Sequence, residues 1–143
     1  DEGGGSASTG NGAVVPLRAI SAYDPEGGDG EHDELVGDAV DGDPSTYWST
    51  ETYRDFSKDG VGLVLEPQRD DGVSTVTVRT DTPGFTAEIK AGDSPTSFPS
   101  TAGESTTVEG TTTFEVDTDA RYLLVWITAL DGRAHVNEVT ARS

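Results

Sequence analysis

The stretch Asp-Ala-Val-Asp-Gly-Asp-Pro-Ser-Thr-Tyr-Trp-Ser-Thr, residues 38 to 50, combines an acidic turn with a large aromatic residue. Asp41 and Asp43 flank Gly42, a residue type that takes a positive φ at little cost. Pro44 then fixes the backbone just before two hydroxyl residues. Such a turn folds back tightly and directs several oxygens inward, so we expect the surrounding structure to be organised around it.

The chemistry of this turn has two interpretations. A calcium ion takes about six to eight oxygen ligands, and a glycine-kinked Asp-x-Asp loop supplies roughly half of them. Alternatively, the side chains cap their own backbone in an Asx turn, Trp48 is a core anchor, and no metal binds. An EF-hand is excluded, because Thr46 and Thr52 stand where that loop needs Gly and Glu.

Composition limits the function classes. The chain has 143 residues, enough for one domain with its own core, and its formal net charge is −18. Nucleic acid is excluded as a partner, because phosphate binding needs a basic footprint that is missing here. Without cysteine there is no disulfide framework, thiolate zinc site or cysteine nucleophile.

The termini and the lack of long apolar runs predict the domain limits. Residues 1–12 are rich in Gly and Ser and are expected to form a flexible tether, so the domain is predicted at residues 13–143. No apolar run reaches the length of about 20 residues that crosses a bilayer. Because the chain starts with Asp1, we expect a piece of a longer protein, anchored in a membrane by a segment outside this sequence.

Apolar and polar residues alternate with a period of two along most of the domain, which predicts short antiparallel strands. Strands are expected at residues 13–22, 61–66, 73–80, 85–90, 111–116, 122–130 and 134–141. No stretch has the periodicity of a long amphipathic helix. The sequence therefore predicts an all-β protein, an antiparallel sandwich of jelly-roll or Greek-key type.

Several details of this sandwich follow from local composition. Pro16 places the first strand at a sheet edge, and the almost continuous apolar run at 122–130 predicts a central strand covered on both faces. The Ser/Thr/Pro-rich residues 93–107 are expected to form a loop. Asp131 and Gly132 are expected to make a hairpin turn into the last strand.

Two further segments invite functional hypotheses. Residues 24–34 are turn-forming and densely acidic, which fits a solvated loop or a second metal site. Residues 51–60 gather aromatic and cationic side chains that suit a sugar or a carboxylate-bearing ligand, or that pack on the core and pair with neighbouring acids. The candidate ligand-binding residues are Tyr53, Arg54, Phe56, Lys58, Arg133 and His135.

Residues 39–49, the apolar strand soon after them, and residues 122–140 with their Val-Asn-Glu-Val resemble the discoidin, or coagulation factor type C, branch of the galactose-binding-like sandwich. In that family an Asp-Gly-x-x-x-Thr-x-Trp loop and a Glu on the final strand share a structural calcium. The resemblance implies that Asp41 and Glu138 are side-chain ligands. It implies further that Thr46 contributes its hydroxyl and carbonyl, and Asp43 mainly its backbone oxygen.

A narrower resemblance rests on Tyr-Asp-Pro-Glu-Gly-Gly-Asp-Gly-Glu-His (23–32), Tyr-Trp-Ser-Thr-Glu-Thr-Tyr (47–53), Val-Gly-Leu-Val-Leu (61–65) and Ala-His-Val-Asn-Glu-Val-Thr-Ala (134–141). These segments are similar to the outer domains of actinobacterial membrane proteins, chiefly serine/threonine kinases and lipid-flippase-like proteins. The resemblance implies an extracellular domain tethered to a membrane protein.

The sequence is compatible with three functions. The first is a non-catalytic binding or sensory ectodomain that recognises a cell-wall glycan or a protein partner and contains a structural calcium. The second is a structural spacer or assembly module with no ligand beyond the ion. The third is a glycosidase that uses two carboxylates, although 27 acidic residues make some suitable pair unavoidable and therefore uninformative. We expect no catalysis.

Overall fold

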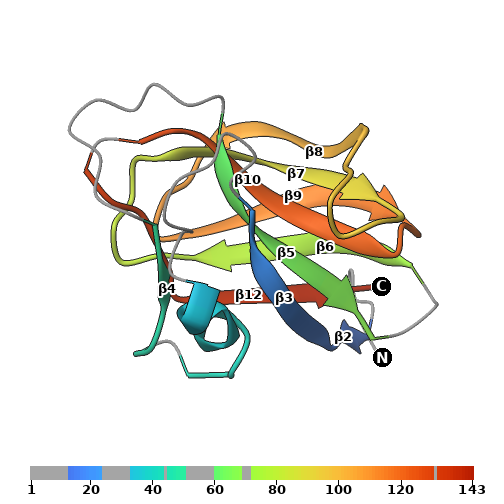
Figure 1. The fold of residues 1–143 in the computed structure, drawn as a ribbon, viewed down its shortest axis with the longest axis horizontal. Helices are drawn as coiled ribbons and strands as arrows, with labels where there is room; N and C mark the ends of the chain where they lie inside the picture. The colour runs from blue at the N-terminus through green and yellow to red at the C-terminus, as the bar shows by residue number, and fades with distance from the viewer. Residues whose placement is uncertain (1–12, 24–32, 44, 51–59, 69–71, 131) are drawn as a thin grey trace.

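The computed structural model describes residues 13–23, 33–43, 45–50, 60–68, 72–130 and 132–143, which fold into two antiparallel sheets (Figure 1). The larger sheet has five strands in the order β3-β5-β10-β7-β8. Its strands are β3 (Leu17–Tyr23), β5 (Val61–Pro67), β7 (Thr86–Gly92), β8 (Ser100–Thr107) and β10 (Tyr122–Ala129). All neighbouring pairs in this sheet are antiparallel, as predicted.

The second sheet has four strands in the order β2-β12-β6-β9. Its strands are β2 (Val14–Val15), β6 (Val73–Arg79), β9 (Thr111–Thr118) and β12 (Glu138–Arg142). A separate pair joins β4 (Trp48–Ser49) to β11 (His135–Val136), and the 3-10 helix η2 (Asp33–Ala39) precedes β4. In the part of the chain that the structure describes, no helix has the length and apolarity needed to cross a membrane.

The core fills the space between the two sheets. It contains the inward-facing residues of every long strand, together with Trp48, whose side chain has no exposed surface. Its largest fully buried members besides Trp48 are Leu63, Leu65, Ile89, Leu123, Ile127, Val15, Val61 and Val76. The all-β sandwich predicted from the two-residue period is confirmed.

Strand β10 is central and covered on both faces, as the apolar run at residues 122–130 predicts. Leu123 faces the core between the sheets, whereas Leu124 on the opposite face packs in a smaller cluster with Val64 and Phe98. Tyr23 and Trp126 lie around that cluster, with ring centroids 5.7 Å apart. Burial on both faces explains why β10 has no polar alternation.

The expected loop at residues 93–107 is wrong in its second half, because residues 100–107 form the edge strand β8. Most of β8 is exposed, so its sequence carries no apolar alternation. It approaches the core closely at Gly103, where an added Cβ would meet side-chain atoms of Ile89, Phe114 and Val116 at 3.1 Å. A strand held mainly by backbone hydrogen bonds is invisible to a hydrophobic pattern.

The expected hairpin from β10 into the last strand is also wrong. β10 belongs to the five-stranded sheet and β12 to the four-stranded sheet, so the connection crosses between sheets and contains β11 on the way. Asp131 itself lies outside the described residues. The first strand likewise divides at Pro16 into β2 and β3, and each lies at the edge of its sheet, which confirms the edge position.

The two ends of the sandwich differ in what they contain. At the end that we call the loop end, β6 finishes at Arg79 opposite Glu138, the first residue of β12. The described residues 38–43, 45–50, 80–85, 130 and 132–137 gather there, at the left of Figure 1. At the other end, the far end, β6 starts at Val73 opposite Thr118 of β9, and Ser143 donates its N–H to Ala13 O.

Candidate functional site

The acidic turn and the closing strand meet at the loop end. The Gly42 N–H donates to Glu138 Oε2 at 3.2 Å, although the two residues are 96 positions apart. Gly42 has φ +78°, which a residue with a side chain adopts only with strain. The left-handed turn aims this N–H at β12, so the structure brings together the two segments that the discoidin resemblance pairs.

Within the turn, Asp43 uses its carboxylate on its own loop. Its Oδ1 accepts from the Ser45 N–H at 3.0 Å and from the Ser45 hydroxyl at 2.6 Å. The bond from the Ser45 hydroxyl, and to a smaller extent the bond from the Ser45 N–H, hold the pKa of Asp43 below its usual value. The Asx turn is therefore present at Asp43, and the Asp43 backbone oxygen accepts from the Thr46 N–H at 3.1 Å.

The Thr46 hydroxyl lies at the centre of a cluster of oxygens. It approaches Asp41 Oδ2, the Asp43 carbonyl oxygen at 2.9 Å and the Asp38 carbonyl oxygen at 3.4 Å. A hydroxyl has a single proton and satisfies one of these acceptors at a time. The remaining oxygens converge without a hydrogen between them, which is the arrangement that a cation stabilises.

Glu138 completes this cluster from the opposite side. Its Oε1 is fully buried and has no hydrogen-bond partner. Burial raises the pKa of Glu138, the Gly42 N–H partly opposes that shift, and the negative charges of Asp41 and Asp43 raise the pKa further. An unpartnered buried carboxylate oxygen beside other oxygens is costly unless a positive charge joins it.

The residues present fit a hard cation. The available oxygens are one carboxylate from Asp41, one from Glu138, the Thr46 hydroxyl and backbone carbonyls of the turn. Within the described part of the chain no group of three His, Cys, Asp or Glu side chains is placed to hold a metal. A donor set that mixes carboxylate, hydroxyl and carbonyl oxygen suits calcium rather than zinc.

Beside the turn, Tyr47 and His135 form a stacked pair. Their ring centroids are 3.9 Å apart with an interplanar angle of 12°. His135 Nδ1 lies 2.7 Å from Asp81 Oδ1, so Nδ1 carries the proton and donates it to the carboxylate. His135 Nε2 is buried and lacks a hydrogen-bond partner. The ring is thus held between an aromatic face and an acid.

Asp81 is fixed in place although its side chain is 55% exposed. The Asn137 amide donates to Asp81 Oδ2 at 3.4 Å, and the Asp81 N–H donates to Asn137 Oδ1 at 3.0 Å. Partial burial would raise the pKa of Asp81, but the bonds from His135 and Asn137 outweigh it and lower the pKa. Asp81 is therefore an ionised, exposed and well-positioned hydrogen-bond acceptor.

Two surface hollows flank the turn at residues 80–84. The Asp81 hollow, of about 400 Å³, is lined by Ser45, Arg79, Thr80, Asp81 and Asn137. The Arg133 hollow, of about 280 Å³, is lined by Thr82, Pro83, Gly84, Phe85, Leu130 and Arg133. Because Ser45 belongs to the acidic turn, the Asp81 hollow adjoins the oxygen cluster.

The candidate residues from the sequence fall into three groups. Asp41, Asp43, Thr46 and Glu138 lie together, while His135 and Arg133 lie beside separate hollows of the same end. Tyr53, Arg54, Phe56 and Lys58, like residues 1–12 and 24–32, lie outside the described residues. Trp48 is fully buried in the core, so it is not a platform for a sugar.

Tyr47, Asp81 and Asn137 were not expected at this site. Tyr47 lies immediately before β4 and next to the core residue Trp48, and the sequence gives no signal that its ring stacks on His135. Asp81 stood between two predicted strands and had no pattern of its own. Its partner Asn137 is 56 residues away, and only the pairing of β6 with β12 brings them together.

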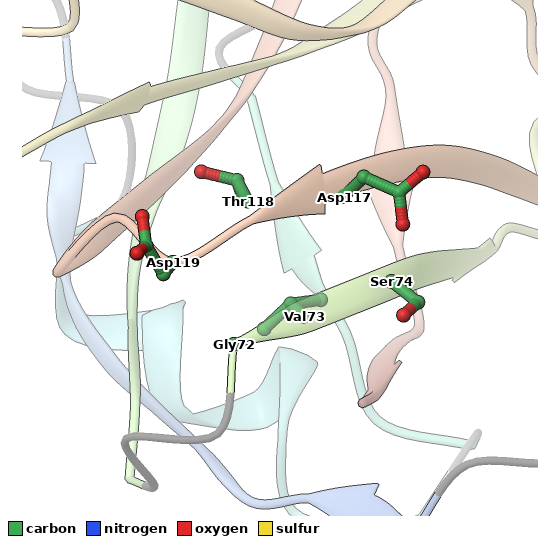
Figure 2. A pocket seen from close by; sticks show the side chains of 6 residues that line it. All are labelled: Gly72, Val73, Ser74, Asp117, Thr118 and Asp119. Atoms are coloured by element: carbon green, nitrogen blue, oxygen red, sulfur yellow. The ribbon is translucent and has the colours of Figure 1, made fainter.

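A third hollow lies at the far end. This Asp117 hollow, of about 430 Å³, is lined by Gly72, Val73, Ser74, Asp117, Thr118 and Asp119. Figure 2 shows that the carboxylates of Asp117 and Asp119 point away from one another, so they do not form a common site. Asp117 has φ +40° beside the irregular pairing of β6 with β9.

Solved structures share this fold, whereas no family model matches the chain. A family 32 carbohydrate-binding module from a family 31 glycoside hydrolase of Clostridium perfringens has a TM-score of 0.66 at 15% identity, over 90% of this chain and 91% of that one. The family 32 module of Clostridium perfringens NanJ in complex with galactose has a TM-score of 0.62 at 17% identity, over 91% and 98%. The chitosan-binding module 1 of a chitosanase/glucanase from Paenibacillus sp. IK-5 has a TM-score of 0.61 at 17% identity, over 90% and 95%. The chain therefore has the discoidin-like, galactose-binding-like β-sandwich fold of the family 32 carbohydrate-binding modules.

Proposed function

We propose that this chain is a non-catalytic carbohydrate-binding module that binds a glycan at its loop end, in the Asp81 hollow. One observation carries this proposal: Asp81 is exposed and ionised, yet His135 and Asn137 hold it in one orientation. A carboxylate fixed in this way accepts hydrogen bonds from sugar hydroxyls without first losing side-chain freedom.

The neighbouring groups suit the same ligand. Arg79 and Asn137 supply donors, Ser45 supplies a hydroxyl, and the stacked Tyr47–His135 pair adjoins Asp81 through His135. Sugars present hydroxyl groups and apolar C–H faces, so a few convergent polar groups beside aromatic rings match them. The similar modules from NanJ and from Paenibacillus bind galactose and chitosan. Because the two modules bind different sugars and are each only 17% identical to this chain, they support carbohydrate as the ligand class and no particular sugar.

The glycan test uses titration calorimetry on hits from a glycan array that includes peptidoglycan fragments. We expect Asp81→Ala to weaken binding at least about tenfold, since a hydrogen bond to a charged group contributes about 1.5–3 kcal/mol. Tyr47→Ala should weaken it as well, because it removes aromatic surface beside the sugar. Asp119→Ala, which removes an acid at the far end, is the matched control. Binding that is unchanged in both loop-end variants would contradict the site. Turnover of a glycoside, abolished by one carboxylate substitution, would contradict the non-catalytic assignment.

For the oxygen cluster we propose a structural calcium ion. Asp41, Glu138, Thr46 and the Asp43 carbonyl would hold it, and the bound ion would neutralise the converging oxygens. The buried, unpartnered Glu138 Oε1 supports this proposal, as does the crowding of acceptors around one Thr46 proton. These residues place the turn against β12 and so set the position of Ser45, at the edge of the Asp81 hollow.

The calcium proposal is tested by melting the protein in calcium and in chelator. An ion at 100 times its Kd stabilises the folded state by about 2.7 kcal/mol, which corresponds to a shift of several degrees in Tm. We expect Asp41→Ala and Glu138→Ala to lose this shift and Asp119→Ala to keep it. A wild-type Tm that ignores calcium would refute the proposal. A calcium shift without any glycan binding would favour a structural spacer.

We propose further that the module works outside the cell, tethered to a membrane protein, where it binds a cell-wall glycan or a protein partner in a sensory role. The high negative charge and the resemblance to outer domains of actinobacterial kinases and flippase-like proteins support this placement. Protease shaving of intact cells that express the full-length protein tests it. A module that protease reaches only after lysis would contradict it.

A further inference from the structure

The basic side chains of the described part of the chain divide into those with a partner and those without. Arg18 lies 3.9 Å from Glu66, and Lys90 lies 3.7 Å from Glu88. The Arg121 guanidinium lies 5.9 Å from the ring centroid of Tyr122. Even a largely exposed basic side chain therefore has a partner, since the Arg18 side chain is 70% exposed and still lies beside Glu66.

Arg79 and Arg133 are different. Among the described residues neither guanidinium has an acidic side chain within ion-pair distance or an aromatic ring beneath it. The chain contains 27 acidic residues and only 9 basic ones, so acidic partners are abundant. Both arginines line hollows of the loop end, where an unpaired guanidinium is available to a ligand.

The two hollows are neighbours. Thr80 lines the Asp81 hollow and Thr82 lines the Arg133 hollow, and the two hydroxyl oxygens lie 3.1 Å apart. Thr82 Oγ1 also accepts a hydrogen bond from the backbone N–H of His135 at 2.9 Å. A ligand that fills the Asp81 hollow is therefore separated from the Arg133 hollow by one hydrogen-bonded turn.

The chemistry of the two hollows is not the same. Arg79 shares its hollow with the ionised Asp81, which offsets its charge. Beside Arg133, the described residues that line the Arg133 hollow include no acid: they supply the Thr82 hydroxyl and the apolar surfaces of Pro83, Phe85 and Leu130. A single unopposed guanidinium beside apolar surface suits a carboxylate carried on a sugar ring.

We infer that Arg133 binds the carboxylate of an acidic sugar, so that this site prefers uronic-acid glycans to the neutral sugars of the same configuration. The inference rests on the proposed function, because the ring that carries the carboxylate occupies the same loop end. A guanidinium makes two parallel hydrogen bonds to a carboxylate, which a neutral hydroxymethyl group does not reproduce.

The overall charge of −18 acts against any anionic ligand at long range. At about 0.15 M salt the Debye length is about 8 Å, so repulsion from distant acids is largely screened, whereas a contact pair within the hollow is screened less. Arg133 acts as a local contact, and its effect is measured at this ionic strength.

The test is titration calorimetry with oligogalacturonate, oligoglucuronate and oligomannuronate, each beside its carboxyl-reduced counterpart. Reduction changes only the carboxylate, so the ratio of the two affinities isolates the acid group. We expect at least one acidic form to bind the wild-type protein about tenfold more tightly than its reduced form, as for one charge-assisted contact. In Arg133→Gln we expect that ratio to fall to about one.

Arg18→Gln is the matched control, because it removes an arginine that is paired and lies away from the hollows, and it should keep the wild-type ratio. Equal affinity for acidic and reduced forms, or an acid preference that survives Arg133→Gln, overturns the inference and leaves the proposed function standing. Failure of every glycan, neutral or acidic, to bind overturns the proposed function as well. Unchanged Tm values of both variants show that they fold.

Discussion

The Asp81 hollow and the Asp117 hollow are both acidic, yet they are built differently. Around Asp81, the side chains of His135 in β11 and of Asn137, between β11 and β12, contact the turn after β6 across 54 and 56 residues of sequence. Around Asp117, the side-chain hydrogen bond is local: the Ala120 N–H donates to Thr118 Oγ1 at 3.1 Å. Of these two hollows, only the Asp81 hollow has a carboxylate that distant segments hold in place, so acidic composition alone does not identify a site.

This comparison also extends to packing. Trp48 anchors the loop end and has no exposed surface, whereas Val73 lines the Asp117 hollow with 4% exposed. We expect Trp48→Ala to lower the free energy of unfolding by about 3–5 kcal/mol, because it leaves a large cavity beside β11. Val73→Ala removes far less volume and should cost less. Urea unfolding measures both, and equal losses would mean that the loop end is no better packed than the far end.

Thr80 tests the hydrogen bonds of the loop end. It is buried, donates to His135 O at 2.6 Å and accepts the Thr82 N–H at 2.9 Å. Thr80→Val keeps the shape but leaves both backbone groups without a partner, so we expect a loss of about 1–3 kcal/mol in urea unfolding.

The matched substitution at the far end is Thr118→Val, which removes one local acceptor at a partly buried position. Its expected cost is below about 1 kcal/mol, since water readily reaches an N–H at the end of a strand. If the two valine variants lose the same unfolding free energy, the long-range hydrogen bonds of Thr80 stabilise the fold no more than the local one of Thr118.

The charge on Asp81 gives a smaller effect with a defined pH dependence. The folded-state pKa of Asp81 is lower than its unfolded value near 3.8, so its stabilisation is present above that value. It is lost as pH falls through the folded-state pKa. Because the group is exposed, we expect less than about 1 kcal/mol. Asp81→Asn should therefore lose less stability than the wild type when urea unfolding is repeated from pH 5 to pH 3. Asp119→Asn should follow the wild type, and an Asp81→Asn curve parallel to the wild-type curve would contradict the role of His135.

The contrast between the two hollows also explains what the sequence predicts and what it does not. The two-residue period identified most long strands, since burial on one face leaves a direct pattern in Val76 and Val78 or in Phe114 and Val116. The sequence of β8 shows no such pattern, because β8 is an exposed edge strand. Its position depends on backbone pairing and on the lack of a side chain at Gly103.

The candidate site divides in the same way. The turn at Asp41–Gly42–Asp43 could be predicted from the sequence, because a tight turn with a positive φ favours Gly and Asp at these positions. Glu138 entered only through the family resemblance, since no local pattern links it to a turn 96 residues earlier. The Asp81–His135–Asn137 group was not predicted as a unit. Asp81 is exposed, His135 is half-buried and Asn137 is buried, and no local pattern marks them as partners, so that only the pairing of β6 with β12 makes them neighbours.

Asp117 provides the smallest expected effect. It has φ +40°, a conformation that Asp and Asn tolerate better than other residues with side chains. We expect Asp117→Asn to change the unfolding free energy by less than about 0.5 kcal/mol, and Asp117→Ala to cost somewhat more because alanine lacks the polar side chain that supports this conformation. Urea unfolding separates the two.

The same Asp117→Asn variant decides where a cation acts. Its carboxylate points away from that of Asp119, so these two described acids do not converge on an ion (Figure 2). The calcium-dependent rise in Tm should therefore be the same in Asp117→Asn as in the wild type, while Asp41→Ala abolishes it. If instead Asp117→Asn loses the rise and Asp41→Ala retains it, the ion binds at the far end. In that case the long-range contacts of the loop end would serve stability alone.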